Sequence, residues 1–218
     1  MSTVDLSELA AQVTGTMPRL DRDGIPLALM TYRRLAEGAS VRVDALACAV
    51  GLSESRAREV LLDACEVMMD EAGAIVGFGG LALAETAHRF EVDGVRLYTW
   101  CAWDALFLPP LLGKSAYVSS TCPVTGQVVN LVVSPGGIVS TDPRPAVMSF
   151  LAPTCSRQDI VTGFCHYVLL FASAQAGEQW TAKHPWTFLL SIEDAFELGG
   201  LVNAARYGPF SATTGLAQ

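Results

Sequence analysis

The sequence predicts an α+β protein, with an N-terminal helical unit of helix-turn-helix or winged-helix type and an antiparallel-rich β body flanked by helices. Over the first third of the 218 residues, apolar side chains recur at the helical period. After Met69, short segments with strand-like composition replace them. The Asp93–Gly94 pair between two such segments is a strong signal for a two-residue hairpin, which favours antiparallel pairing. We therefore expect a helical unit over residues 1–80 and an α+β body over residues 81–218.

Helices account for most of the expected N-terminal unit. The apolar spacing predicts a weak helix within residues 1–24, then helices from Pro26 to before Gly38, over Val43–Val50, and from Ser53 to about Met69. Gly51 ends the third of these helices, and a short turn joins it to the fourth. This helix-turn-helix pattern is typical of DNA-binding proteins but also occurs as a reused helical packing unit.

The body is expected to alternate between short strands and helices. The predicted strands are Ala74–Gly79, His88–Val92, Val95–Cys101, Ala116–Thr121, Gln127–Val133, Ala146–Leu151 and Cys165–Phe171. The predicted helices are a short one from Trp103 that Pro109 and Pro110 stop, one near Ser156–Thr162, and two over Glu178–Lys183 and Ser191–Arg206. A connector rich in proline and glycine follows Val133.

Charge and hydropathy exclude several classes of protein. With 22 Asp and Glu against 14 Lys and Arg, the net charge is -8, whereas a protein that wraps nucleic acid needs a basic face. The longest apolar runs, Val128–Val133 and Tyr167–Ala172, are far shorter than the ~20 residues of a membrane-spanning helix. The N-terminus has no basic region before an apolar stretch, so no secretory signal is expected. We expect a cytoplasmic protein with no nucleic-acid or membrane partner, whose cysteines stay reduced.

Three of the six cysteines have plain structural interpretations, and a fourth has no assigned role. Cys48 and Cys65 fall on apolar helical stripes and are expected in the core. Cys122 begins a tight turn, where a structural role is favoured over a role as a ligand. Cys155 lies in a loop-like context and the sequence indicates no partner for it.

Cys101 and Asp104 lie at the expected junction between a strand and a helix. Three residues apart across a turn, a thiol and a carboxyl can face the same point. The plain alternative is that Asp104 caps the helix while Cys101 fills the core. Trp100 and Trp103 flank the pair, and desolvation by these rings would raise the pKa of the carboxyl above its usual ~3.9. Such a carboxyl could exchange a proton with the thiol.

Cys165 begins an apolar segment, preceded by Phe164 and followed by His166. A core cysteine is one interpretation. A zinc site is another, with Cys101, Cys122, Cys165 and His166 as ligands. Structural zinc sites usually take their ligands in close pairs, and the absence of CxxC and HxxxH disfavours this site.

Three sequence blocks follow one another in a recognisable order: Arg96–Pro109 (RLYTWCAWDALFLP), Val118–Gly126 (VSSTCPVTG) and Phe164–Ser173. Together they resemble the organomercurial lyase (alkylmercury lyase) family. The helix-turn-helix segment and the Glu193–Gly199 neighbourhood fit as well, so the resemblance covers residues 27–200.

The resemblance implies cleavage of carbon–mercury bonds, giving a hydrocarbon and Hg(II) without an organic cofactor. It assigns Cys101 and Cys165 as the mercury-binding thiols. Asp104 would be the proton-handling carboxylate and a further ligand of the Hg(II) product. Cys122 matches a family cysteine regarded as structural, and His166 stands where some members have a second cysteine. The resemblance also implies that an exogenous thiol is needed, and that Hg(II) passes to mercuric reductase or to small thiols.

The chemistry agrees with these residue types. Mercury is a soft metal, and thiolates bind such metals tightly. Two thiolates push electron density through mercury onto its carbon, which then accepts a proton from an acid shielded from water. We expect Asp104 to take a proton from one thiol, first Cys101, and to deliver it to carbon. Trp100, Trp103 and Phe164 either shape an apolar pocket for the organic group or pack in the core.

Two other functions stay open at this point. A mercury- or metal-responsive regulator would bind DNA through the helix-turn-helix and sense the metal with its cysteines. A thiol-redox protein would pair Cys101 with Cys165, although no CxxC motif is present. The lyase interpretation requires both sulfurs and the Asp104 carboxyl to converge within roughly 4–6 Å around one point.

Overall fold

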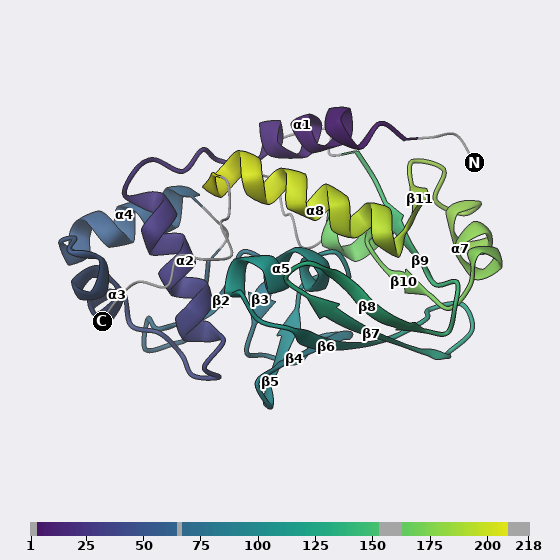
Figure 1. The fold of residues 1–218 in the computed structure, drawn as a ribbon. Coiled ribbons are helices and arrows are strands. Elements are labelled where there is room, and N and C mark those ends of the chain that lie inside the picture. The colour runs from purple at the N-terminus through teal and green to yellow at the C-terminus, as the bar shows by residue number, and fades with distance from the viewer. Residues whose placement is uncertain (1–3, 65–66, 153–162, 209–218) are drawn as a thin grey trace.

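A large antiparallel sheet forms the centre of the molecule, with helices on one of its faces and at one of its ends (Figure 1). The computed structural model describes residues 4–64, 67–152 and 163–208. The helices α5 (Asp104–Leu112) and α8 (Ile192–Tyr207) lie over the sheet, and α1 (Leu6–Thr16) lies along the outer side of α8. The predicted α+β class is confirmed. In the described part of the chain, no helix combines the length and apolar character needed to cross a membrane.

The expected helices of the N-terminal third are present. After α1 they are α2 (Gly24–Leu35), α3 (Val43–Val50) and α4 (Glu54–Ala64). Gly51 ends α3 as predicted, with a φ of +73° that glycine adopts at little cost. The buried side of α3 consists of Val43, Leu46 and Ala47. Cys48 lies outside this stripe and is exposed, so its expected place in the core is wrong.

The fourth helix is shorter than predicted. Beyond it the chain forms strand β1 (Val67–Met69), which pairs with β2 (Ile75–Phe78). The Asp70 carboxylate accepts hydrogen bonds from the backbone N–H groups of Ala72 and Ala74 and holds the connecting turn. The prediction of a helix up to the end of β1 is therefore wrong, because this turn makes the segment one strand of a hairpin.

Within the described residues, eight strands form the main sheet in the order β1-β2-β3-β5-β4-β6-β7-β8. Those after β2 are β3 (Leu81–Ala82), β4 (His88–Val92), β5 (Val95–Thr99), β6 (Ala116–Thr121), β7 (Val128–Ser134) and β8 (Gly137–Asp142). The predicted hairpin is confirmed, because Val92 pairs with Val95 and the turn residues Asp93 and Gly94 both have positive φ.

A second, three-stranded sheet has the order β10-β9-β11. It consists of β9 (Val147–Phe150), β10 (Leu170–Phe171) and β11 (Phe188–Ser191), with α7 (Ala174–Thr181) packed beside it. β11 was not predicted, and neither was β8, which lies within the expected connector. β8 is an edge strand in which no side chain is fully buried and the two apolar residues, Ile138 and Val139, are adjacent, so it lacks the apolar alternation that signals a strand.

The predicted strand Cys165–Phe171 is wrong in its first half. Its first residues form the short 3-10 helix η1 (Cys165–Tyr167), and only its end belongs to β10. Ser149 explains the break, because its hydroxyl donates to the carbonyl of Tyr167 and accepts from the N–H of Leu169. The predicted helix Ser156–Thr162 lies outside the described residues.

Helix α5 continues through Pro109 and Pro110, where the sequence predicts its end. Proline lacks an N–H and crowds a preceding carbonyl, so it normally stops a helix. This helix persists because nearly all its side chains are buried, and because the Asn203 amide of α8 donates to the carbonyl of Phe107 at 2.9 Å. Burial of the apolar helix outweighs the proline penalty.

Close contact between α5 and α8 fixes the start of α5. Gly199 of α8 lies so near Phe107 that a Cβ on it would be 2.8 Å from the Phe107 Cβ. The indole N–H of Trp103 donates to the carbonyl of Ala195 at 2.9 Å. These contacts hold the first turn of α5, which begins with Asp104.

Candidate active site

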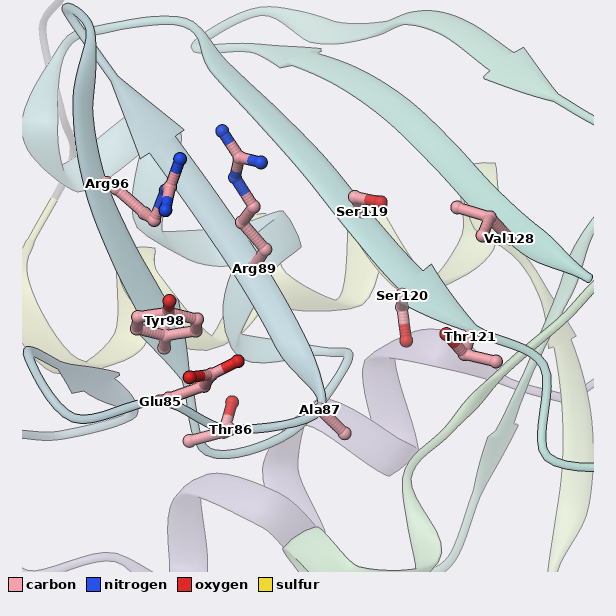
Figure 2. A pocket seen from close by; sticks show the side chains of 10 residues that line it. All are labelled: Glu85, Thr86, Ala87, Arg89, Arg96, Tyr98, Ser119, Ser120, Thr121 and Val128. Atoms are coloured by element: carbon pink, nitrogen blue, oxygen red, sulfur yellow. The ribbon is translucent and has the colours of Figure 1, made fainter. Parts of the chain in front are cut away.

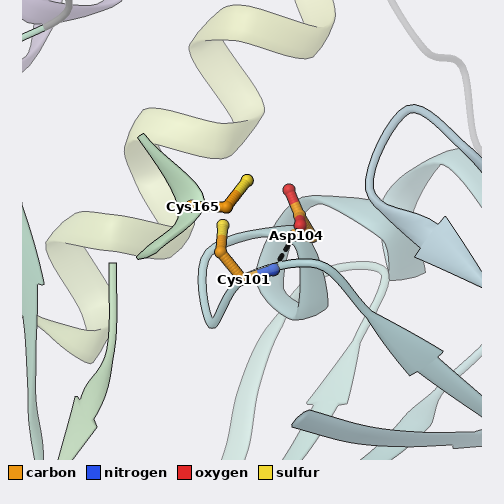
Figure 3. Close-up of side chains that lie close together, drawn as sticks. All are labelled: Cys101, Asp104 and Cys165. Atoms are coloured by element: carbon orange, nitrogen blue, oxygen red, sulfur yellow. Dashed lines mark hydrogen bonds between the residues drawn. The ribbon is translucent and has the colours of Figure 1, made fainter. Parts of the chain in front are cut away.

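Two thiols and a carboxyl from distant parts of the sequence meet in the interior (Figure 3). The sulfur atoms of Cys101 and Cys165 and a carboxylate oxygen of Asp104 all lie within 4.8 Å of one another. The exposed fractions are 0% for Cys101, 4% for Cys165 and 6% for Asp104. The convergence that the lyase interpretation requires is therefore met. Two sulfur ligands beside one oxygen ligand suit a soft metal ion.

The turn between β5 and α5 places Cys101 and Asp104. The N–H of Cys101 donates to Oδ2 of Asp104 at 2.7 Å, as the dashed line in Figure 3 marks. The Thr99 hydroxyl donates to the carbonyl of Cys101 at 2.9 Å. The N-cap of α5 is Trp103, and Asp104 binds an N–H that precedes the helix. The alternative of a helix-capping aspartate is therefore wrong.

Cys165 reaches the cluster from the segment before β10. It is the first residue of η1 and points toward Cys101 and Asp104 in Figure 3. A main-chain hydrogen bond of 3.1 Å, from the N–H of Ala102 to the carbonyl of Val168, joins the two segments that carry the sulfurs. The backbone itself thus brings the two cysteines together.

Burial changes the protonation of these groups. It raises the pKa of Asp104 from 3.8 to about 7, although hydrogen bonds from Cys101 and from the Trp100 backbone oppose the shift. Burial, hydrogen bonding to Cys165 and the charge of Asp104 together raise the pKa of the Cys101 thiol well above its usual range. Burial thus favours the protonated form of the thiol and brings the pKa of the carboxyl close to neutral, so the carboxyl can accept or donate a proton.

Comparison with known proteins assigns the chain to a family. A family model described as MerB, alkylmercury lyase, matches residues 81–203, which include the whole cluster. The chain belongs to the alkylmercury lyase family. An alkylmercury lyase of Staphylococcus epidermidis is 38% identical over 212 residues, which cover 97% of each chain. One of Pseudomonas putida is 44% identical over 176 residues, covering 81% of this chain and 82% of the relative.

The fold matches a solved structure, described as the crystal structure of the mercury-bound form of MerB2. The TM-score is 0.75 at 21% identity, over 92% of this chain and 98% of that one. This likeness concerns the fold alone. The relatives named here are all alkylmercury lyases, so the alternative of a DNA-binding regulator gains no support from them.

In this member of the alkylmercury lyase family, the rings of Trp103, Phe150 and Phe164 pack against one another. Trp103 is buried, with ring centroids 5.3 Å from Phe150 and 6.3 Å from Phe164. Phe164 is half-buried, immediately before Cys165. Trp100 is half-buried too, and its indole N–H is enclosed without a hydrogen-bond partner among the described residues. Trp103 is thus core, whereas Phe164 and Trp100 retain exposed surface.

Cys122 is buried apart from the cluster, in the turn between β6 and β7. Its N–H donates to the carbonyl of Gln127 at 2.8 Å, and its own carbonyl accepts from Gly126 at 2.9 Å. Burial raises the pKa of its thiol, but hydrogen bonds from the Thr125 side chain, the Ala172 backbone and the turn lower it by more. These contacts fit the expected structural role.

His166 is exposed next to Cys165, and its ring packs edge-on against Tyr167 with centroids 5.0 Å apart. The cluster of metal-ligating groups found within the described residues contains neither His166 nor Cys122, so a zinc site gains no support. Cys65 and Cys155 lie outside the described residues.

A separate hollow of about 350 Å³ lies on the outer face of the sheet (Figure 2). Its lining residues are Glu85, Thr86, Ala87, Arg89, Arg96, Tyr98, Ser119, Ser120, Thr121 and Val128. Arg89 is paired with Glu91 at 2.5 Å. None of the lining residues belongs to the cluster, so the hollow and the candidate active site are distinct.

Gly80 is a residue of the site that sequence reasoning missed. A Cβ at this position would lie 2.5 Å from Cγ of Asp104, and the backbone has a φ of +97°. The only signal in the sequence was the Gly79–Gly80 pair at the end of a predicted strand.

Proposed function

We propose that this chain cleaves the carbon–mercury bond of alkyl- and arylmercury compounds by protonolysis, giving a hydrocarbon and Hg(II). The observation that carries the proposal is the buried convergence of Cys101, Asp104 and Cys165 within 4.8 Å in a member of the alkylmercury lyase family. Soft ligands for mercury and a proton carrier for carbon are the two things that this reaction requires.

The three side chains divide the reaction between them. The Cys101 sulfur binds mercury of R–Hg–X, and its proton moves to Asp104. The Cys165 thiol binds next and loses its proton in the same way. One of the two protons leaves with the displaced ligand as HX, and Asp104 delivers the other to carbon. R–Hg–X and two thiols thus give RH, HX and Hg(II) held by two thiolates.

The protonation states support this order. The Cys101 thiol has a raised pKa and needs mercury to ionise it, since metal binding displaces the proton of a ligand. Asp104, with a pKa of about 7, is able to accept that proton and to give it up again. The buried site keeps bulk water from competing as the acceptor.

The product is Hg(II) bound by Cys101 and Cys165, with Asp104 as a further ligand. Two protein thiolates hold it tightly, so its release needs an exogenous thiol as a competing ligand. We place the protein in the cytoplasm, where small thiols are abundant, and expect it to pass Hg(II) to them or to mercuric reductase. No organic cofactor takes part in the proposed reaction.

The organic group is expected to lie against Trp100 and Phe164, which directly precede Cys101 and Cys165 in the chain and retain exposed surface. Trp103 supports Phe164 from within, because the two rings pack edge-on. An apolar wall here favours an alkyl or aryl group over water.

We also propose that residues 1–80 are a helical unit of helix-turn-helix type used for packing, with residues 81–218 as the catalytic body. Four arginines of this helical unit, Arg34, Arg42, Arg56 and Arg58, are paired with acids, which argues against phosphate binding. Arg56 bonds Asp21, Asp23 and Glu59, and Arg58 bonds Glu54. Within residues 1–80, a bridge between Val41 and Ile75 joins the helices to β2, which belongs to the main sheet.

The test is incubation of the protein with phenylmercury and an excess of a small thiol, with benzene measured in the headspace. Repeated turnovers are expected, with Hg(II) recovered as its thiol complex. Bovine serum albumin at the same thiol concentration is the control for uncatalysed cleavage. Benzene at the control rate would refute the proposed function.

A further inference from the structure

A glycine turn presses its backbone against the carboxyl of Asp104. Gly79 and Gly80 connect β2 to β3, with φ angles of +47° and +97°. A Cβ on Gly80 would lie 2.5 Å from Cγ and 2.7 Å from Oδ1 of Asp104. Real Cβ atoms do not approach other atoms so closely, so only glycine allows this contact.

The turn is fixed from two sides. The carbonyl of Gly80 accepts a hydrogen bond of 2.8 Å from the N–H of Trp100. On the other side, the hydroxyl of Tyr32 in α2 donates to the carbonyl of Gly79 at 3.0 Å. Tyr32 is itself buried and packs edge-on against Phe78, with ring centroids 4.9 Å apart. Tyr32 therefore links helix α2 to the turn that lies against the active-site carboxyl.

We propose that Tyr32 and the Gly79–Gly80 turn are positioning residues that hold the Asp104 carboxyl against the two sulfurs. The carboxyl is confined between the N–H of Cys101, which binds Oδ2, and the backbone of Gly80, which lies against Oδ1. It cannot rotate or withdraw without displacing the turn. Tyr32 keeps the turn in place.

The inference rests on the proposed function and gives the N-terminal helices a part in it. A proton carrier must reach both a thiol and the mercury-bound carbon, and a displacement of about 1 Å can cost a reaction ~100-fold in rate. The equilibrium binding of Hg(II) depends mainly on the two sulfurs and needs this alignment far less than protonation of carbon does. Loosening the turn should therefore slow the protonation of carbon and leave uptake of mercury intact.

The direct test replaces Gly80 by alanine, with Gly73→Ala as the matched control. Gly73 also has a positive φ, of +76°, but a Cβ on it would meet nothing within 4 Å. The two variants thus share the backbone strain and differ in the contact with Asp104. We expect kcat for benzene release to fall at least ~100-fold in Gly80→Ala and less than ~3-fold in Gly73→Ala. Equal losses would overturn the inference.

A milder test replaces Tyr32 by phenylalanine, which keeps the ring and removes the hydroxyl that holds Gly79. The control is Thr31→Val, which removes a neighbouring buried hydroxyl that donates within α2, to the carbonyl of Leu27 at 2.8 Å. We expect kcat to fall ~10-fold in Tyr32→Phe with KM unchanged, and Thr31→Val to keep the wild-type kcat.

Two readouts separate the outcomes. Mercury uptake is followed as the loss of titratable thiols with Hg(II) in folded protein, and benzene release is followed as turnover. Unchanged uptake with slowed turnover in Gly80→Ala and Tyr32→Phe supports the inference. Turnover in Tyr32→Phe no slower than in Thr31→Val overturns it, while the proposed function stands. Absence of benzene release by the wild type would instead refute the proposed function.

Discussion

Burial shifts the pKa values of His88 and Asp104 in opposite directions, away from neutral pH for the histidine and toward it for the carboxyl. His88 of β4 and Ser120 of β6 are register partners, both buried, with Nδ1 and Oγ 2.9 Å apart. Burial lowers the pKa of His88 from 6.5 to about 4. Burial also raises the pKa of Asp104 from 3.8 to about 7.

In both places burial favours the neutral form, and the ordinary pKa of the group decides the outcome. The histidine moves out of the physiological range, stays neutral and serves as a hydrogen-bonded element of the sheet. The carboxyl moves into that range, and Cys101 and Cys165 lie beside it as proton donors and metal ligands. Burial alone therefore does not mark an active site, whereas a pKa brought near 7 among reactive partners does.

The largest difference in turnover is expected between substitutions of the active-site thiols and a substitution of His88. Cys101→Ser and Cys165→Ser should each reduce benzene release from phenylmercury to the uncatalysed rate, because mercury needs both sulfurs and the groups act as a unit. His88→Asn, which keeps a hydrogen-bonding amide near Ser120, should stay within ~3-fold of wild type. Near-normal turnover in either serine variant would remove that thiol from the mechanism.

Loss of the carboxyl should have the next largest effect. Asp104→Ala removes the proton carrier, which typically contributes 10²–10⁴-fold to a rate, so we expect turnover to fall by about that factor. Both sulfurs remain, and equilibrium dialysis should still find one Hg(II) per chain. A wild-type rate in this variant would exclude Asp104 as the proton donor.

The pH dependence should follow the carboxyl and not the histidine. Asp104 must be ionised to accept the first thiol proton, so kcat/KM should rise about tenfold per pH unit below about 7 and level off above it. The Cys101 thiol stays protonated over this range. His88→Asn should leave the profile unchanged. A midpoint near 4 would point to the histidine and contradict this assignment.

The smallest effect concerns stability. Because the folded-state pKa of Asp104 is raised, the wild type loses stability as pH rises from about 4 to about 7. Asp104→Asn does not ionise, so we expect it to be more stable than wild type above pH 7 by roughly 1–2 kcal/mol. The pKa shift of Asp104 corresponds to ~4 kcal/mol of unfolding free energy. The expected gain is smaller, because the hydrogen bond from the Cys101 N–H is weaker to an amide oxygen than to a carboxylate. Urea unfolding at pH 4.5 and pH 8 measures this. An equal difference at both pH values would contradict it.

The sequence predicts elements whose signals are local. The hairpin at Asp93 and Gly94, the end of α3 at Gly51 and the alternation in β4 to β7 all depend on neighbouring residues, and these predictions are confirmed. The sequence does not reveal α5 beyond Pro109, because that helix depends on burial against α8. Nor does it reveal the break of η1, which a hydroxyl from Ser149 produces across the fold.

The candidate site also combines a local feature that the sequence predicts with long-range contacts that it does not. The spacing of Cys101 and Asp104 suggests a local pair, but only the family resemblance linked them to Cys165. The distance between the sulfurs depends on tertiary structure, which no sequence pattern encodes. The contact of Gly80 with Asp104 is equally non-local, because it joins the β2–β3 turn to the first residue of α5.

The main-chain bond between Ala102 and Val168 constrains the distance between the two sulfurs that would chelate a metal ion. An amide and a carbonyl make this bond, so side-chain substitutions around it can change the size of the organic group admitted while the sulfur-to-sulfur span stays constant. Redesign of the pair for a larger or smaller soft cation would therefore have to begin with the peptide backbone, for example by altering the length of the segment that leads from Cys165 to Val168.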